Sequence, residues 1–473
     1  MLTILGAVAL SATAYYLSIG LGPFWPAVWI APIPVLVVAA RRRARTAALI
    51  AFAACFAGSR NLLTFLARVM PLPIVIVMLA LTSLVCVTAV LSARLAMQAL
   101  PGGIAAFAFP ATWTAGEFVL SLLSPHGTAF SLAYTQTDVL PLLQIASVTG
   151  LWGVTFLVTL APSAAAAAWV RGSPALVPAA LIFACVFAFG FSRLRQDRSM
   201  VPIRVGLAAT DEGIRAAVET RDPVLAGRVA REYADRIAQL GGRAARVIVL
   251  PEKFVGITQA NSPAVLSILA DAARSARATV VAGVNRIGDP PHNVALVFRP
   301  DGGIETEYEK HHLLPGAETG YAIGATPGIF APPAPMVTSP FPVADVVWGI
   351  QICKDLDFTE WSRRYAQQGA RIVAVPAWDF VRDARLHSRM AVMRGVENGF
   401  ALARAAQEGL LTLSDAYGRI VAETTSGQHP DALLVGDLAP GPGATLYTRW
   451  GDWFGWFAFC AAAILLMWAG VTG

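Results

Sequence analysis

Residues 346–357 read VVWGIQICKDLD, an apolar run followed by a polar turn. The run is rich in β-branched and aromatic residues, which predicts a buried strand that ends at Cys353. Lys354 and Asp355 then begin the turn toward the next element. A thiol at such a turn can face a cleft and have its pKa lowered by nearby amides and cations. From this stretch alone, Cys353 is either a nucleophile or an inert buried thiol.

The other four cysteines fall in apolar stretches, where small buried hydrophobes are the ordinary interpretation. They are Cys55, Cys86, Cys185 and Cys460. Cys353 therefore has no disulfide partner within its own polar region, and no paired-cysteine spacing typical of a metal site occurs.

The polar region around Cys353 covers residues 193–452 and alternates short β-branched runs with helical stretches. This alternation predicts one α/β domain. Expected strands are Ile203–Ala208, Arg246–Leu250, Thr279–Asn285, Asn293–Arg299, Val346–Cys353, Arg371–Val375 and Leu410–Ser414. Expected helices are Pro223–Leu240, Pro263–Arg277, Thr359–Gln368 and Ala384–Asn398, and the Pro-rich stretch Ala325–Pro342 is expected to be a surface loop.

Outside this domain the chain is strongly apolar. Its 473 residues are 56% hydrophobic and only 14% charged, with a mean hydropathy of +0.58. Such a composition excludes a wholly soluble or disordered chain. The net charge of +6 comes entirely from residues 1–192, while residues 193–452 balance 28 basic against 28 acidic side chains. The balanced domain therefore offers no basic face for nucleic acid.

Eight stretches are long and apolar enough to predict membrane spans, seven before the polar domain and one after it. They lie near 2–20, 23–40, 46–66, 72–92, 103–123, 149–170, 174–192 and 453–471. With a cytoplasmic N-terminus, six arginines fall in inside loops and two outside, which favours this orientation. The sequence thus predicts a bundle over 1–192, an extracytoplasmic domain over 193–452 and a final span over 453–473.

Lysine usage points to a small set of residues. The chain has 33 arginines but only three lysines: Lys253, Lys310 and Lys354. A lysine ammonium is a compact point charge that an arginine does not replace beside an oxyanion. Lys253 follows Glu252 at an expected strand end, and Lys354 follows Cys353. Taken alone, Glu252 reads as a solvated strand end and Lys310 as part of a charged loop.

The order Glu252, Lys310, Cys353, with gaps of 58 and 43 residues, changes this interpretation. A strand followed by Pro-Glu, then Tyr-x-Lys-x-x-Leu-x-Pro with Glu318 eight residues after the lysine, then Ile-Cys, resembles the nitrilase (carbon–nitrogen hydrolase) superfamily. The resemblance implies a Glu-Lys-Cys triad on a four-layer αββα sandwich. Glu318 would orient Lys310 or share the acid–base work.

The membrane part is similar to one branch of that superfamily, the apolipoprotein N-acyltransferase family. The similar motifs are Phe109-Pro110-Ala111-Thr112-Trp113 with Glu117, Tyr134-x-Gln136, Thr149-Gly150-x-Trp152-Gly153, Phe156-Leu157, Met393–Gly399 with Arg404, and Gly451-Asp452-Trp453. The resemblance covers nearly the whole chain. It implies seven spans, a periplasmic nitrilase domain and one last span in the bacterial inner membrane.

Several substrate-facing positions depart from the family's pattern. The family's Trp-x-Glu becomes Leu250-Pro251-Glu252, and Cys-Tyr-Glu becomes Cys353-Lys354-Asp355. Asn-Asp-x-Trp-Phe-Gly appears as 376–380, PAWDF, and Gly-Phe-Pro-Trp as 126–130, HGTAF. We therefore expect Lys354, Asp355 and Trp378 to bind substrate, and the reaction class is better defined than the substrate.

The resemblance implies that Glu252 takes the proton of Cys353 and that the thiolate accepts an acyl chain from a phospholipid. The N-terminal amine of a diacylated lipoprotein then accepts that chain, and Lys310 stabilises the oxyanion. No metal, nucleotide or other cofactor is expected, and the chain is expected to be a monomer. Two alternatives stay open: a membrane-anchored amidase in which water resolves the thioester, and a transporter or receptor whose nitrilase-like domain only binds.

Two further groups have ordinary interpretations beside functional ones. Glu117 lies at membrane depth on the helix face of Trp113, where a carboxylate is either functional or a structural hydrogen-bond acceptor. His311, His312 and His387 are expected to be ordinary polar-domain histidines.

Overall fold

The computed structural model describes all residues except 1–2, 197–199, 334–345, 428–431 and 473. These residues form two compact units. The first comprises residues 1–196 with 450–473, and the second comprises residues 197–449. The chain therefore leaves the first unit, builds the whole second unit, and returns with its last helix.

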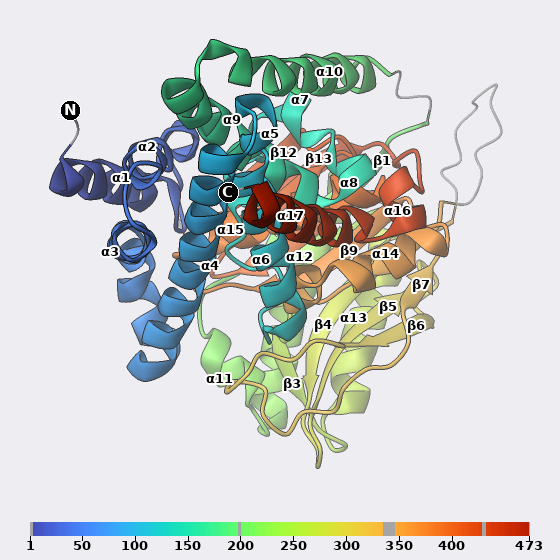
Figure 1. The fold of residues 1–473 in the computed structure, drawn as a ribbon. Coiled ribbons are helices and arrows are strands. Elements are labelled where there is room, and N and C mark those ends of the chain that lie inside the picture. The colour runs from blue at the N-terminus through green and yellow to red at the C-terminus, as the bar shows by residue number, and fades with distance from the viewer. Residues whose placement is uncertain (1–2, 197–199, 334–345, 428–431, 473) are drawn as a thin grey trace. The chain divides into compact units, whose positions relative to one another are not determined.

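The first unit is helical (Figure 1). Its longer helices are α1 (Ile4–Ser18), α3 (Ala44–Val69), α4 (Leu72–Ala99), α6 (Ala108–Leu123), α9 (Leu151–Arg171), α10 (Val177–Leu194) and α17 (Trp453–Thr472). Shorter pieces are η1 (Trp25–Trp29), α2 (Ile33–Ala39), α5 (Gly102–Ala105), η2 (Leu132–Gln136), α7 (Leu140–Leu143), α8 (Ala146–Thr149) and η3 (Ser173–Leu176).

Six helices of the described chain are long and apolar enough to cross a membrane. They are Ala44–Val69, Leu72–Ala99, Gly102–Leu123, Leu151–Arg171, Ser173–Leu194 and Trp453–Val471. They correspond to the third to eighth expected spans. The first two expected spans appear as the shorter apolar helices Ile4–Ser18 and Trp25–Ala39, so a total of eight stays a prediction.

Glu117 inside this bundle is paired with several polar groups. Trp113 Nε1 donates to Glu117 Oε1 at 2.9 Å, as their shared helix face predicts. Ser131 Oγ and Thr155 Oγ1 donate to Glu117 Oε2 at 2.6 and 3.0 Å, and the Leu132 amide donates to Oε1 at 3.1 Å. The carboxylate thus ties α6 to η2 and α9.

The second unit contains two sheets. The seven-stranded sheet has the order β13-β1-β2-β4-β5-β6, with β3 also paired to β4, and the six-stranded sheet has the order β12-β11-β10-β9-β8-β7. Their bounds are β1 (Ile203–Ala209), β2 (Val247–Val249), β3 (Val255–Ile257), β4 (Thr279–Arg286), β5 (His292–Phe298), β6 (Ile304–Glu309), β7 (Gly328–Phe330), β8 (Trp348–Ile350), β9 (Ile372–Trp378), β10 (Ala401–Gln407), β11 (Leu410–Ser414), β12 (Ile420–Thr425) and β13 (Ala432–Leu438).

Two of these strands correct details of the sequence interpretation. The strand expected over Val346–Cys353 is shorter: β8 ends at Ile350, and Cys353 begins the 3₁₀ turn η4 (Cys353–Asp357). The stretch Ala325–Pro342 is not wholly a loop, because β7 lies within it and pairs with β8. The remainder of that stretch from residue 334 lies outside the described residues.

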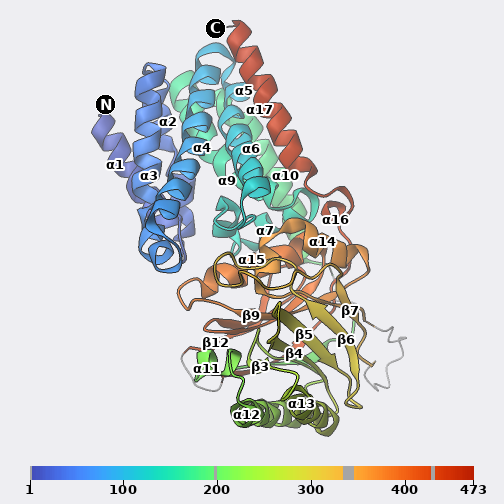
Figure 2. The same ribbon diagram turned by 90° about the horizontal axis from the view of Figure 1, so that it is seen from below.

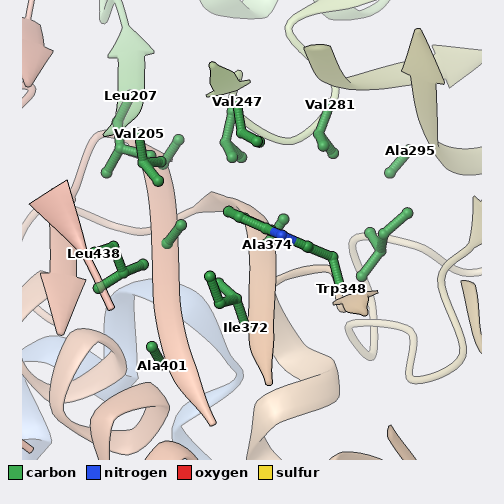
Figure 3. Close-up of a cluster of buried hydrophobic side chains, with 14 of the residues drawn as sticks. Val205, Leu207, Val247, Val281, Ala295, Trp348, Ile372, Ala374, Ala401 and Leu438 are labelled. Carbon is green, nitrogen blue, oxygen red and sulfur yellow. The ribbon is translucent and has the colours of Figure 1, made fainter. Parts of the chain in front are cut away.

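The centre of each sheet is parallel. Strands β1, β2 and β4 run parallel in one sheet, and β8, β9 and β10 in the other. Apolar side chains of the two sets point toward one another and form the core between the sheets (Figure 3). Parallel strands place their carboxyl ends at one edge, which is where α/β folds bind ligands.

Helices cover the outer faces of the sheets. They are α11 (Ile214–Val218), α12 (Pro223–Gly242), α13 (Ser262–Ala276), α14 (Thr359–Gln367) and α15 (Ala384–Asn398), and the short helix α16 (Leu446–Trp450) follows β13. A second apolar cluster packs α12 and α13 on the first sheet, and a third packs α14 and α15 on β9 and β10 (Figure 2). The amphipathic spacing of α12, α13 and α14 explains why the sequence predicts them well, whereas α15 is buried on nearly all sides.

Candidate active site

Cys353 lies at the turn between β8 and η4 with a backbone φ of +44°. This left-handed conformation is unusual for a residue with a β-carbon and is typical of functional turns. The thiol is partly buried and donates a hydrogen bond to the Trp378 carbonyl at 3.4 Å. Burial, followed by the charge of Glu252, raises the pKa of Cys353 well above its usual value. The resting thiol is therefore protonated, and a nucleophilic role for it would require a base.

Lys310 follows the edge strand β6 and is buried. Its Nζ lies 2.8 Å from Glu252 Oε1 and 2.8 Å from Glu318 Oε2. Burial alone would lower the pKa of Lys310, but Glu252 and Glu318 outweigh it and hold the pKa well above its usual range. The ammonium therefore stays charged and can face a developing negative charge.

Glu252 follows β2, and the backbone around it is held from two sides. Its amide donates to the Ala377 carbonyl at 3.3 Å, and Gln407 Nε2 donates to its carbonyl at 2.7 Å. Gly283 on β4 permits the close passage, because a β-carbon there would lie 2.3 Å from the Pro251 carbonyl oxygen. Glu252 and Cys353 thus contact consecutive residues, Ala377 and Trp378, at the end of β9.

Glu318 is held by four donors. Its Oε1 accepts from Lys253 Nζ at 2.8 Å and from Asn293 Nδ2 at 2.7 Å. Its Oε2 accepts from Lys310 Nζ at 2.8 Å and from the Leu314 amide at 2.7 Å. Burial would raise the pKa of Glu318, but Lys310 and Lys253 reverse this and hold it far below its usual range. Glu318 is therefore a permanent carboxylate.

Asn293 is the residue that the sequence interpretation missed. It lies on β5, wholly buried, and its Nδ2 donates to Glu252 Oε1 at 2.6 Å as well as to Glu318. One amide thus bridges both carboxylates of the site. The sequence signal that could have found Asn293 is its pairing with Lys310, which directly follows β6. That signal could not be used, because β6 was itself not expected.

The three residues expected to bind substrate occupy different environments. Lys354 is buried and lies 3.1 Å from Asp357. Asp355 is wholly buried, with Oδ2 accepting from Tyr308 Oη and the Ile352 amide and Oδ1 accepting from the His312 amide. These bonds make Asp355 an anchor for the turn that carries Cys353.

Trp378 is only half-buried, and its ring is fixed by its neighbours. Its Nε1 donates to Glu408 Oε2 at 2.9 Å, and Lys253 Nζ lies 5.8 Å from the ring centroid. Of the three expected residues, Trp378 is the most exposed.

The expected histidines have mainly structural contacts. His311 stacks on Trp361 at 3.8 Å between ring centroids, and His312 stacks on Phe358 at 3.7 Å. Both clamp the segment after Lys310 onto the elements that follow Cys353.

A separate cluster of titratable side chains directly follows Trp378 in the sequence. Asp379, Asp383 and His387 offer ligand atoms within 4.8 Å of one another, the spacing of a metal site. However, Arg404 donates to both oxygens of Asp379, at 2.9 and 2.5 Å, so this carboxylate is already engaged. The donor set fits an ion-pair network better than a metal centre.

Taken together, the parallel-centred sheets and a cysteine, lysine and two glutamates at the strand ends define the class: a nitrilase-fold domain joined to apolar helices. Comparison with known families agrees. Residues 11–164 match the model "Apolipoprotein N-acyltransferase N-terminal domain", and residues 226–440 match "Carbon-nitrogen hydrolase". The particular family that the chain resembles over most of its length is that of the apolipoprotein N-acyltransferases.

Individual relatives cover most of the chain. An apolipoprotein N-acyltransferase from Geobacter metallireducens is 28% identical over 93% of this chain and 90% of its own length. One from Vibrio parahaemolyticus is 26% identical over 77% and 75%. Among solved structures, an amidase from Nesterenkonia sp. is 21% identical, covers 50% of this chain and 91% of its own, and has a TM-score of 0.41.

Proposed function

We propose that this protein transfers an acyl chain from a membrane phospholipid, through a thioester on Cys353, to the N-terminal amine of a diacylated lipoprotein. Similarity to the apolipoprotein N-acyltransferase family supports the reaction class, and the apolar helices suit substrates that stay in a bilayer. The proposal includes eight spans and a catalytic domain over 193–452 with four αββα layers on the periplasmic side of a bacterial inner membrane. We further propose a monomer that needs no metal or other cofactor.

In the first half-reaction, Glu252 takes the thiol proton and Sγ of Cys353 attacks the ester carbonyl of the phospholipid. The oxyanion forms beside Lys310 Nζ and the amide that follows Cys353. When the tetrahedral intermediate collapses, the carbon–oxygen ester bond breaks and Glu252 returns the proton to the departing oxygen. The products are the acyl-thioester and a lysophospholipid.

In the second half-reaction, the free amine of the acceptor attacks the thioester carbonyl. Glu252 takes a proton from the attacking nitrogen, the carbon–sulfur bond breaks, and the proton returns to the sulfur. The amide is released and the thiol is restored. Because Glu318 is ionised and fully engaged, we assign it to orienting Lys310 and not to proton transfer.

The observation that carries this proposal is the shared lysine. Lys310 bridges two buried carboxylates while Cys353 and Glu252 contact adjacent residues of β9. A buried ammonium held in place by two carboxylates is suited to stabilising an oxyanion. Losing such a donor typically lowers the rate by a factor of about 10²–10³.

Intact-protein mass spectrometry after incubation with phospholipid vesicles tests the proposal. A fatty-acyl mass on Cys353, absent from Cys353→Ala, is the expected result. Adding a diacylated peptide should discharge the adduct onto the peptide amine. Discharge in buffer alone, at the same rate, would instead identify water as the acceptor and favour the amidase alternative. No adduct in folded protein would overturn the phospholipid donor.

A further inference from the structure

Lys253 is a second lysine in this site, and the reaction outlined above does not use it. Its Nζ lies 2.8 Å from Glu318 Oε1, and its side chain is 11% exposed. The ammonium also lies 5.2 Å from the centroid of the Tyr321 ring and 5.8 Å from that of Trp378. The backbone of Lys253 is left-handed, with φ +48°, which turns the side chain back toward the site.

Glu318 does not need Lys253 to satisfy its hydrogen bonds. Without that lysine, Oε1 still accepts from Asn293, and Oε2 still accepts from Lys310 and the Leu314 amide. The distinct contribution of Lys253 is therefore its charge. The hydrogen-bonded group contains two lysines and two glutamates, so its charges cancel, and the neutral Asn293 bridges the two acids.

Removing Lys253 would leave this buried group with one excess negative charge. Charges act over several ångströms in a buried site because the effective dielectric constant is low. Both the thiolate and the oxyanion place new negative charge beside Lys310, so an excess negative charge opposes each of them. Lys310 would also be bound more tightly by its two carboxylates.

We propose that Lys253 is a charge-balancing positioning residue: it neutralises Glu318 so that the charge of Lys310 remains available to the thiolate and the oxyanion. Its effect on acyl transfer rests on the proposed function, whereas its effect on the thiol does not. The ring of Trp378 lies near Lys253, and the backbone carbonyl of the same residue accepts the hydrogen bond of the Cys353 thiol. Trp378 therefore gives Lys253 a defined place beside the nucleophile.

The test measures the alkylation rate of Cys353 by iodoacetamide in the full-length protein in detergent micelles, with the modified site located by mass spectrometry. Lys253→Met keeps the aliphatic stem and removes the charge. We expect its rate at pH 7.5 to be about tenfold lower than that of the wild type, equivalent to a thiol pKa about one unit higher. Lys253→Arg keeps the charge and should recover most of the rate.

The decisive variant is Lys253→Met combined with Glu318→Gln, which removes one positive and one negative charge. Charge balance predicts that this pair reacts faster than Lys253→Met alone, whereas loss of a purely structural ion pair predicts no recovery. Arg389→Met is the matched control, because it removes a buried cation paired with Glu423 outside the site. Its alkylation rate should match that of the wild type.

Wild-type reactivity in Lys253→Met, or no recovery in the double variant, would overturn the proposal. Lys253→Gln gives the same comparison if Lys253→Met does not fold. The outcome is separable from that of the proposed function: a wild-type Cys353 that alkylates in this pattern but forms no thioester with phospholipid would refute only the acyl-transfer reaction.

Discussion

Strained backbone conformations gather around this site. Lys253, Cys353, Val381 and Glu408 all have left-handed φ values, between +44° and +59°, and each lies shortly after a strand of the parallel centres. A residue with a β-carbon in this region costs about 1–3 kcal/mol. At Lys253 and Cys353, the turn directs a functional side chain toward the strand edge, so we interpret the strain there as part of how the site is held.

Glu252→Gln tests the base directly. The amide keeps the size of the side chain but accepts no proton, so thioester formation should fall about 10²–10⁴-fold. Lys310 still has Glu318 as a partner, so the thermal midpoint should change little. A variant that folds and forms the thioester at the wild-type rate would exclude Glu252 as the base.

Asn293→Leu tests the bridge between the two carboxylates. Loss of hydrogen bonds to charged groups costs about 1.5–3 kcal/mol, which predicts thioester formation about 10–100-fold slower. Asn261→Ala removes another buried asparagine, at the start of α13, and serves as the control. A wild-type rate of thioester formation in Asn293→Leu would argue against the bridging role.

At this scale the sequence selected residues that the structure brings together, but it missed part of their surroundings. Glu252, Lys310, Glu318 and Cys353 were predicted, and the structure brings the first three into direct contact. The rarity of lysine was informative, because two of the three lysines bind Glu318 and the third follows Cys353. Asn293 was missed since a single asparagine on a strand has no pattern that marks it.

Among the elements, strands β6 and β10 were not expected from the sequence. Strand β6 reads IETEYE and lies at the edge of its sheet, where one side is solvated. Strand β10 reads ALARAAQ, which has weak strand propensity, and it forms because it is buried between β9 and β11. Both strands matter to the site, since Lys310 follows one and Gln407 ends the other.

The stability of the junction between α15 and β9 should depend on pH through the ionisation of His387. Burial would lower its pKa, but Asp383 and Asp379 outweigh this and raise it to about 9. The pKa of an unfolded histidine is about 6.5. The stabilisation from the ion pairs of protonated His387 is therefore complete below that pH and is lost as the pH rises through about 9. The nearby charges are Asp357, Asp379, Asp383 and Arg404.

Thermal melts of the full-length protein in detergent measure this effect. Between pH 6.5 and 9.5, the wild type should lose up to about 3 kcal/mol that His387→Gln does not lose, because one pKa unit corresponds to about 1.36 kcal/mol. Parallel pH curves for the two proteins would show that the ion pair contributes nothing to stability.

Across the whole molecule, the last helix completes the first unit. Trp152 Nε1 donates to Asp452 Oδ1 at 2.8 Å, and Trp453 Nε1 donates to the Val148 carbonyl at 2.8 Å. Gly455 packs so closely on α6 that a β-carbon there would lie 2.7 Å from the Phe118 ring. The sequence predicted a final span but gave no sign of which helix it contacts, because its apolar residues surround the helix evenly.

Gly455→Ala should therefore destabilise the first unit by about 1–3 kcal/mol, the usual cost of overpacking. Gly470→Ala, in the same helix, is the matched control, since a β-carbon there meets nothing within 4 Å. Tryptophan fluorescence during thermal unfolding in detergent should separate the two variants. Equal thermal midpoints for the two variants would mean that α17 shifts to accept the new β-carbon without a loss of stability.

The place of α17 in the chain also has a consequence for biosynthesis. Residues 197–449 must be translated after α10 and before α17. At about 5–20 residues per second, this takes roughly 13–50 seconds. During that interval, the surface of α6 around Phe118 awaits its partner. Until the final segment is made, this surface lacks the cover that α17 gives it, so the helical unit begins first and is finished last.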